Sequence, residues 1–475
     1  MSRPLRFLAF ALVAALLASA CSGGGGEEAE DATPTTVPTA TNELPPTPTP
    51  VPIPDNAIRV GVLLDTGSQD EGGVDAGNVM SVLDRAPGVA FEAQIQAIND
   101  AGGLLGRPIA VIKVDTTSRR SVIDRAARNM IDAGVDLIVV TCEFDFAEPA
   151  IVRAEEAGVL VMSPCAAETG WTTGAAGDLA FSMVPPVQTY GVAMADYMWD
   201  QGYRNVAVMS DQSAPEARAE CAAFAQRWRE LGGTFQYSES FTLRAADDLD
   251  DNLQVRRARD ADAIAFCAFS IIGQMLLGGD SDVAGIRAMN IDVPIVAGPS
   301  FDTGTWLPLD FPGLGVFRLL ALSSVHGDDP VPAITPAIDG FTAIDTARPQ
   351  SGRFVLGADL ADLWAQAVVA VGTTDGTTVA AELRAMRDVD TISGQITFGG
   401  FQAPQSRQLR VLRHSNGRLV FEDFLEVRQD LDAPSVDDAG EIDPSADPDA
   451  VDGDDAPVEG GGDDAVDDEA DDADN

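Results

Sequence analysis

The chain has 475 residues, a formal net charge of −45 at pH 7 and a sequence pI near 4.1. The sequence contains 30 basic and 75 acidic residues. This balance excludes nucleic acid as a partner, because neutralising phosphates requires clustered positive charge.

Residues 1–20 have the pattern of a secretory signal peptide. Arg3 and Arg6 form a short basic start, and the apolar run that follows is too short to span a bilayer. The run ends in small residues directly before Cys21, which resembles the bacterial lipobox and would make Cys21 the lipidated N-terminus. Ala18 stands where Leu is commoner in that motif. An ordinary signal peptide that is followed by a Cys is the alternative.

Residues 21–57 are rich in Gly, Glu, Thr and Pro and lack aliphatic periodicity. Such a segment cannot bury a core, so we expect a disordered tether with partly polyproline conformation. Apart from the signal peptide, no run of eighteen apolar residues predicts a membrane span.

The next segment alternates between short β-rich runs and helical periodicity. Strands are predicted at 58–64, 108–114, 135–140 and 159–162. Helices are predicted around 91–98, 122–130 and 149–157. This alternation is typical of βαβ units and a parallel, doubly wound sheet.

The same alternation then restarts, which predicts a second α/β lobe. Strands are expected at 205–209, 234–240, 263–268, 293–297 and 315–322, and helical segments at 216–231, 249–259 and 273–277. A late helix at 359–371 and a hairpin built from 396–398, 408–413 and 419–424 end the fold.

The expected architecture is α/β, with two doubly wound parallel-sheet lobes joined by a multi-strand hinge. The first lobe comprises 58–183 and about 326–395, and the second comprises 184–325 and about 396–428. Residues 429–475 carry twenty acidic residues and no Lys or Arg, so we expect an acidic disordered tail. Its nearest match to a calcium loop, from Asp447 to Gly453, lacks a ligand at the fifth position, and no metal site is predicted.

Four cysteines remain after Cys21, two in each half of the globular region. Four cysteines allow three connectivities. Because each pair would fall within one lobe, the pairs Cys142–Cys165 and Cys221–Cys267 are the hypothesis for an exported protein.

The string from Ala97 to Pro108, AINDAGGLLGRP, resembles the helix-to-strand signature of type I periplasmic binding proteins of the branched-chain amino-acid class. The resemblance continues through Val114-Asp115, 132–136 and 157–164, and covers roughly residues 58–427. It implies a solute receptor whose lobes close over a ligand and which delivers that ligand to an ATP-driven permease. Relatives also serve as ligand-sensing domains.

In amino-acid binders of this class a first-lobe Ser/Thr pair holds the ligand carboxylate, and a second-lobe acid pairs with its ammonium. These positions correspond to Phe144 or its neighbour, to Ala167 and to Ile271. None of these three polar side chains is present, so the chain lacks the groups with which the family binds an amino acid. The ammonium of such a ligand would be buried unpaired beside Ile271.

Ligands of open α/β sheets bind outside the carboxyl ends of the strands. The loops there supply the predicted ligand-binding residues, which are Asp65, Ser68, Phe144, Asp145, Phe146, Ala166, Ala167, Trp171, Tyr190, Asp211, Phe269, Ile271, Ser300 and Phe301.

No enzyme motif is present: the two histidines, His326 and His414, lie far apart in sequence, and there is no nucleophile elbow. We therefore expect a monomeric solute-binding lipoprotein without a cofactor, held at the outer face of the cytoplasmic membrane by its lipid alone. Its partners would be a small-molecule solute (amino-acid-like, an amide or another small organic compound) and the permease and ATPase of an ABC importer. A surface sensor or interaction protein of the same fold is the alternative, and a hydrolase is a third.

Overall fold

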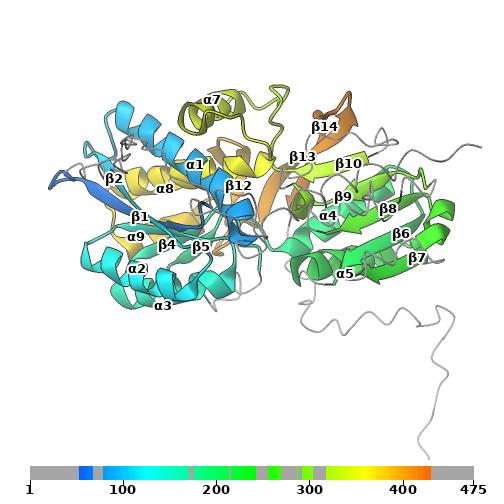
Figure 1. The fold of residues 1–475 in the computed structure, drawn as a ribbon, viewed down its shortest axis with the longest axis horizontal. Helices are drawn as coiled ribbons and strands as arrows, with labels where there is room; N and C mark the ends of the chain where they lie inside the picture. Colours follow the sequence, from blue (N-terminus) through cyan, green and yellow to red (C-terminus); the bar gives the residue numbers. More distant parts are fainter. Residues whose placement is uncertain are drawn as a thin grey trace, which may run out of the picture. The chain divides into compact units, whose positions relative to one another are not determined.

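The computed structural model describes residues 53–67, 79–168, 171, 176–212, 215–241, 255–268, 286, 291–302 and 317–428 (Figure 1). These residues build two β-sheets, each packed against helices, and both sheets belong to the unit Ile53–Asn475. The predicted α/β class and its parallel sheets are therefore confirmed.

The first sheet has five parallel strands in the order β2-β1-β3-β4-β5. Their bounds are β1 Ile58–Leu64, β2 Ile109–Asp115, β3 Leu137–Val140, β4 Leu160–Ser163 and β5 Ala180–Ser182. Alternate side chains enter opposite cores: Val62 packs on one face and Leu63 on the other. Helices thus cover both faces, which explains why these strands read as continuous apolar runs.

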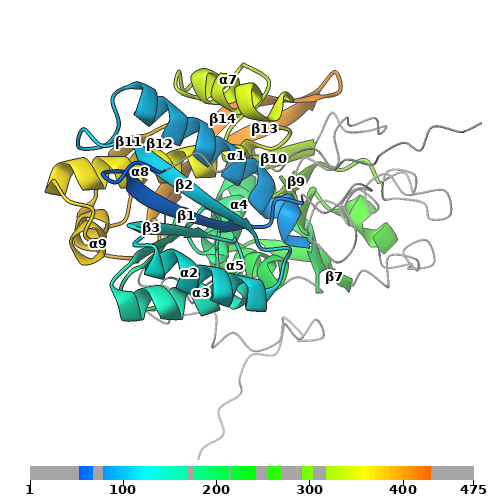
Figure 2. The ribbon, with the colours of Figure 1, turned by 60° about the vertical axis from the view of Figure 1, so that its left-hand side comes forward.

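Two helix groups cover this sheet, as Figure 2 shows. On one face lie α2 Arg120–Asp132 and α3 Phe144–Ala157. On the other face lie α1 Val79–Asp100, α8 Val355–Val371 and α9 Gly376–Ala385, and α7 Ile334–Asp345 packs against α1. Among the described residues, one helical segment, Gly352–Val371, is long and apolar enough to cross a membrane by composition, but most of it is buried in this core.

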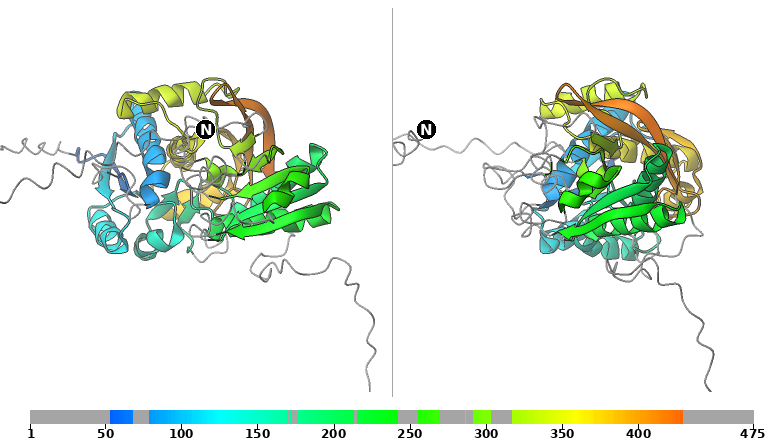
Figure 3. Two further views of the ribbon diagram at one scale, coloured as in Figure 1. Left: turned by 45° about the vertical axis from the view of Figure 1, so that its right-hand side comes forward. Right: turned by 90° about the vertical axis from the view of Figure 1, so that its right-hand side faces the viewer.

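The second sheet follows the order β11-β12-β13-β10-β9-β8-β6-β7, and β14 pairs with β13. In Figure 3 the long orange strands of the C-terminal hairpin curve beside the green strands of this sheet. The strands are β6 Asn205–Asp211, β7 Thr234–Phe241, β8 Ala263–Cys267, β9 Ile295–Ala297, β10 Phe317–Ala321, β11 Val389–Thr391, β12 Gly394–Thr397, β13 Ser406–Ser415 and β14 Arg418–Arg428. Strands β6 to β10 are parallel, and the late strands join them antiparallel. Among the described residues, the helices on this side are α4 Val187–Asp200 and α5 Pro215–Glu230.

The described chain passes between the two sheets three times. It leaves the first sheet after β5, returns to it after β10 with α7, α8 and α9, and re-enters the second sheet at β11. The sequence placed the return to the second lobe at about residue 396. Strand β11, which pairs with β12, begins earlier, at Val389.

Three short 3-10 helices complete the described elements: η3 Val255–Asp260, η4 Pro299–Phe301 and η6 Gly352–Phe354. The predicted helix at 249–259 is represented by η3, and the one at 273–277 lies outside the described residues.

Helix α3 begins at Phe144, five residues before the predicted start at Pro149. Pro149 lacks the N–H that would bond to the carbonyl of Asp145 four residues earlier. The guanidinium of Arg120 donates to that carbonyl instead. A side chain from α2 thus lets the helix run through the proline.

The glycine turn that follows α1 needs a backbone that other residues adopt poorly. Gly102 and Gly103 have φ of 112° and 80°, and a Cβ on Gly103 would collide with the carbonyl group of Arg107. This turn directs the chain from α1 into β2, so its glycines serve the fold and do not bind phosphate.

A buried ion pair joins α8, which packs on the first sheet, to β13 of the second. Arg407 donates to Asp359, and both side chains are essentially inaccessible to solvent. Asp359 also accepts bonds from the backbone N–H and the hydroxyl of Ser393, at 2.9 and 2.6 Å. The second Arg407 amine donates to the carbonyl of Met183.

Candidate functional site

A cavity of about 40 Å³ lies where the loops of the two sheets meet. It is lined by Leu83, Cys142, Glu143, Cys165, Ala167, Val184, Val187, Tyr190, Glu216, Pro299, Ser300, Leu322 and Arg353. Cys142, Cys165 and Pro299 follow the carboxyl ends of β3, β4 and β9, which is where open α/β sheets place their ligands. A space of this size holds a few water molecules, so the two walls lie close together.

Asp84 of α1 fixes the first-sheet wall. Its buried carboxylate accepts the backbone N–H of Asp65 at 2.9 Å and that of Cys142 at 3.1 Å. Burial raises the pKa of Asp84 to about 7, although these hydrogen bonds lower it. One side chain therefore ties the loops after β1 and β3 to the same helix.

Two disulfides are present, and they join the pairs expected from the sequence. Cys142–Cys165 links the loop after β3 to the loop after β4, with a Cα–Cα distance of 4.7 Å. Cys221–Cys267 links α5 to the end of β8, with a Cα–Cα distance of 5.8 Å. The first disulfide forms part of the cavity wall itself.

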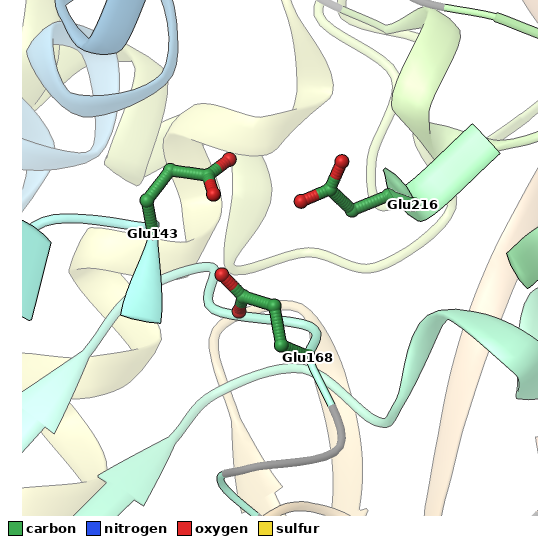
Figure 4. A group of neighbouring side chains, drawn as sticks. All are labelled: Glu143, Glu168 and Glu216. Carbon is green, nitrogen blue, oxygen red and sulfur yellow. The ribbon is translucent and has the colours of Figure 1, made fainter. Parts of the chain in front are cut away.

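Three carboxylates converge at this site (Figure 4). Glu143 precedes α3 and Glu168 follows β4 on the first-sheet side, whereas Glu216 lies in the first turn of α5 on the second-sheet side. One oxygen of each carboxylate lies within 4.8 Å of the others. Glu168 Oε1 accepts the backbone N–H of Phe144 at 2.7 Å, which orients its carboxylate.

The environment disfavours negative charge on two of these carboxylates. Burial, followed by the charge of Glu216, raises the pKa of Glu143 to about 9. Burial also raises the pKa of Glu168 to about 7, and the N–H of Phe144 opposes that rise. The grouping of the three side chains therefore favours the protonated form of Glu143 and Glu168.

Tyr190 and Arg353 contribute the other polar groups of the cavity wall. Tyr190 of α4 is 4% exposed, and its hydroxyl has no hydrogen-bond partner among the described residues. Arg353 of η6 donates to the carbonyl of Pro299 at 3.4 Å, while its Nε finds no partner among those residues. Burial lowers the Arg353 pKa, and the charge of Asp302 opposes that change.

Two more buried acids lie around Arg353. Burial raises the pKa of Glu220 to about 8 and that of Asp302 to about 6, and the charge of Arg353 opposes both rises. Asp302 accepts the backbone N–H of Gly352 at 2.9 Å, which connects η4 to η6.

Of the residues predicted from the sequence to bind ligand, Ala167, Tyr190 and Ser300 line the cavity. The others in the described part of the chain do not line it. Asp65 is buried and accepts bonds from Gly67 N–H and the Ser118 hydroxyl. Asp145 is exposed in the first turn of α3, and Asp211 is buried at the end of β6.

The predicted aromatic contacts that lie in the described part of the chain pack in or against the hydrophobic cores. Phe144 and Trp171 meet edge-on at 6.1 Å between ring centres in the core that also contains Ala166, and Phe146 packs on both neighbouring cores. Phe301 is 1% exposed and packs against Phe266 and Phe317, with ring centres 5.7 Å away in each case. Ser68, Phe269, Ile271 and Cys21 lie outside the described residues.

Sequence reasoning missed Glu143, Glu168, Glu216 and Arg353. Glu143 directly precedes the predicted residue Phe144, Glu168 directly follows the predicted residue Ala167, and Glu216 lies in the first turn of α5. Charged residues in loops after parallel strands were the available signal for these three. Arg353 lies far along the chain from those loops, and only the return of the chain after β10 brings it to the cavity.

The family model described as periplasmic binding protein matches residues 58–418. The chain belongs to the periplasmic binding protein family. No curated protein matches its sequence. The fold that the resemblance implied, the type I periplasmic binding protein fold, is confirmed.

Solved structures of this family share the fold at low identity. The branched-chain amino-acid binding protein LivJ of Streptococcus pneumoniae, in complex with isoleucine, is 20% identical, with a TM-score of 0.61 over 78% of this chain and 100% of LivJ. A solute-binding protein of R. palustris, in complex with benzoate, is 16% identical, with a TM-score of 0.61 over 79% and 98%. An ABC-transporter substrate-binding protein of Sphaerobacter thermophilus is 18% identical, with a TM-score of 0.66 over 79% and 99%.

As a periplasmic binding protein, the chain is an exported solute-binding protein and not an enzyme.

Proposed function

We propose that this protein is a lipid-anchored receptor that closes over a small organic solute and delivers it to an ABC importer. The observation that carries the proposal is the cavity, whose lining comes from both sheets and from the returning segment at Arg353. A ligand that contacts all three parts stabilises the closed arrangement, and a permease can recognise that arrangement.

The ligands of two relatives support a small organic molecule as the solute, but these ligands differ in charge and therefore do not indicate the charge of the solute. LivJ of S. pneumoniae holds isoleucine and the R. palustris protein holds benzoate. The fold thus accommodates a zwitterion and an aromatic acid, and the side chains of each cavity decide which solute is bound.

The test begins with native mass spectrometry of the purified protein, which finds any solute that is retained. That solute should raise the melting temperature and reduce the radius of gyration measured by X-ray scattering. If no solute from a broad library does either, the protein is not a transport receptor.

Tyr190→Phe tests the placement of the ligand. It removes only a hydroxyl that has no partner among the described residues, so the protein without added solute should keep its stability. Affinity for the solute should fall by about tenfold, as expected for a lost hydrogen bond in a desolvated site. Tyr197→Phe on the same helix is the matched control, since Tyr197 does not line the cavity.

The lipid anchor rests on Cys21 and is tested separately. The intact protein should remain with the membrane fraction, and Cys21→Ser should release it. Equal membrane association of both proteins would contradict the anchor and leave the binding function untouched.

A further inference from the structure

The carboxylates of Glu143, Glu168 and Glu216 are assembled from both halves of the molecule. The first two follow strands of the first sheet, and the third begins a helix of the second. Since one oxygen of each lies within 4.8 Å of the others, separating the halves would take the cluster apart. The group therefore exists as a site in the closed arrangement.

The charge around this cluster is unbalanced. Glu143 and Glu216 line the cavity with a mainly apolar wall that includes Leu83, Val184 and Val187, and Arg353 is the single basic residue among the lining residues described. The charges of Asp302, Glu216 and Glu143 all act on Arg353, so its one positive charge is shared among several carboxylates. The remaining neighbours, Tyr190, Glu220 and Asp302, add no positive charge.

A second feature of the same cavity indicates a ligand. The hydroxyl of Tyr190 lies on a side chain that is 4% exposed, and it has no hydrogen-bond partner among the described residues. Buried hydroxyls in native proteins are almost always paired, so an unpaired one on a cavity wall marks a position that a ligand or water fills. Tyr190 and the carboxylates Glu143 and Glu216 face one space.

We propose that Glu143, Glu168 and Glu216 form a cation subsite that is completed when the two halves close, and that the protein selects a positively charged ligand. The cation is the ammonium group of an organic amine or a divalent metal ion, because carboxylate oxygens bind both. The inference rests on the proposed receptor function and names the class of solute that the receptor takes.

The physical reason is the cost of closing without a cation. When the halves are apart, the three carboxylates are hydrated and ionised at neutral pH. Bringing three like charges within 4.8 Å of one another in a partly buried space costs electrostatic free energy. A cationic ligand offsets that repulsion.

Charge-matched probes test the assignment on the full-length protein. Diaminobutane, butanediol and succinate share a four-carbon chain and differ in charge, and Ca²⁺ represents the metal. At millimolar concentration diaminobutane or Ca²⁺ should raise the melting temperature and compact the particle, and butanediol and succinate should do neither. Diaminobutane acting alone identifies an organic amine as the cation, and Ca²⁺ acting alone identifies a metal.

Isosteric variants connect the effect to the cluster. Glu143→Gln and Glu216→Gln each remove one negative charge and should weaken binding of the active cation by about tenfold or more. Glu148→Gln removes the same charge from an exposed position on α3, paired with Arg120, and should leave binding unchanged. Because losing a charge relieves repulsion, the cluster variants should fold at least as well as the parent at pH 8.

The failures of the two proposals are distinguishable. If a neutral or anionic solute compacts the protein while both cations fail, the receptor function stands and the cation subsite is wrong. If cation binding survives Glu143→Gln and Glu216→Gln unchanged, the subsite is also wrong. If no solute of any charge compacts the protein, both proposals fall.

Discussion

The buried pair between Asp359 and Arg407 gives the sharpest stability prediction. Both side chains are essentially inaccessible to solvent, and Asp359 receives three bonds, from Arg407 and from the N–H and hydroxyl of Ser393. Asp359→Ala removes the carboxylate and leaves the Arg407 guanidinium buried without its counter-charge. Removing one partner of such a pair costs about 3–5 kcal/mol, because the remaining charge stays desolvated.

The double variant Asp359→Leu/Arg407→Met separates the loss of the pair from the burial of a lone charge. Replacing a buried ion pair by apolar residues of similar volume is often close to neutral, so this variant should recover most of the lost stability. Urea unfolding, followed by tryptophan fluorescence, gives the free energy of unfolding for all the variants. A loss below about 1 kcal/mol for Asp359→Ala would refute the reasoning, since the guanidinium would then have found water or another partner.

Three further predictions concern other parts of the fold. Burial raises the pKa of Asp84 to about 7 and that of Glu220 to about 8, so the folded state binds more protons than the unfolded state between about pH 4 and pH 8. The free energy of unfolding should therefore fall as the pH rises through that window. Urea unfolding at pH 5 and pH 8 measures the difference, and a higher free energy of unfolding at pH 8 would contradict the prediction. Replacing Cys142 and Cys165 by Ser opens a loop with a sequence separation of 23 and should cost about 3 kcal/mol, measured by the same method against the oxidised parent, whereas the reduced parent should lose more because Cys221–Cys267 opens as well. Gly357→Ala would place a Cβ against the Pro87 carbonyl group where α1 and α8 cross, and it should lower the melting temperature. Gly340→Ala is the control and should not lower it, because its Cβ would meet Ala93 at an ordinary 3.5 Å. Equal melting temperatures of the two variants would show that α1 and α8 can separate without cost.

Most of the fold could be predicted from local sequence because its strands and helices carry clear periods. The run Ile58–Leu64 forms β1 with the predicted bounds, and the late hairpin forms as β13 and β14. Helices α4, α7 and α9 and strands β5 and β11 were not predicted. Strand β5 has three residues, and α4 is buried over much of its surface, so its sequence shows no polar face to set a period.

The candidate site was also predictable only in part from the sequence. The sequence by itself determined the loops, because the carboxyl ends of parallel strands must meet, and it indicated both disulfide pairs, because each falls within one lobe. Only the tertiary structure decided which side chains face the cavity. Phe301 and Trp171 turned into the cores, whereas Glu143, Glu168 and Glu216, which are remote in sequence, came together. Local periodicity encodes which face of an element is apolar, but the meeting of three carboxylates depends on how two separately folded sheets close on each other.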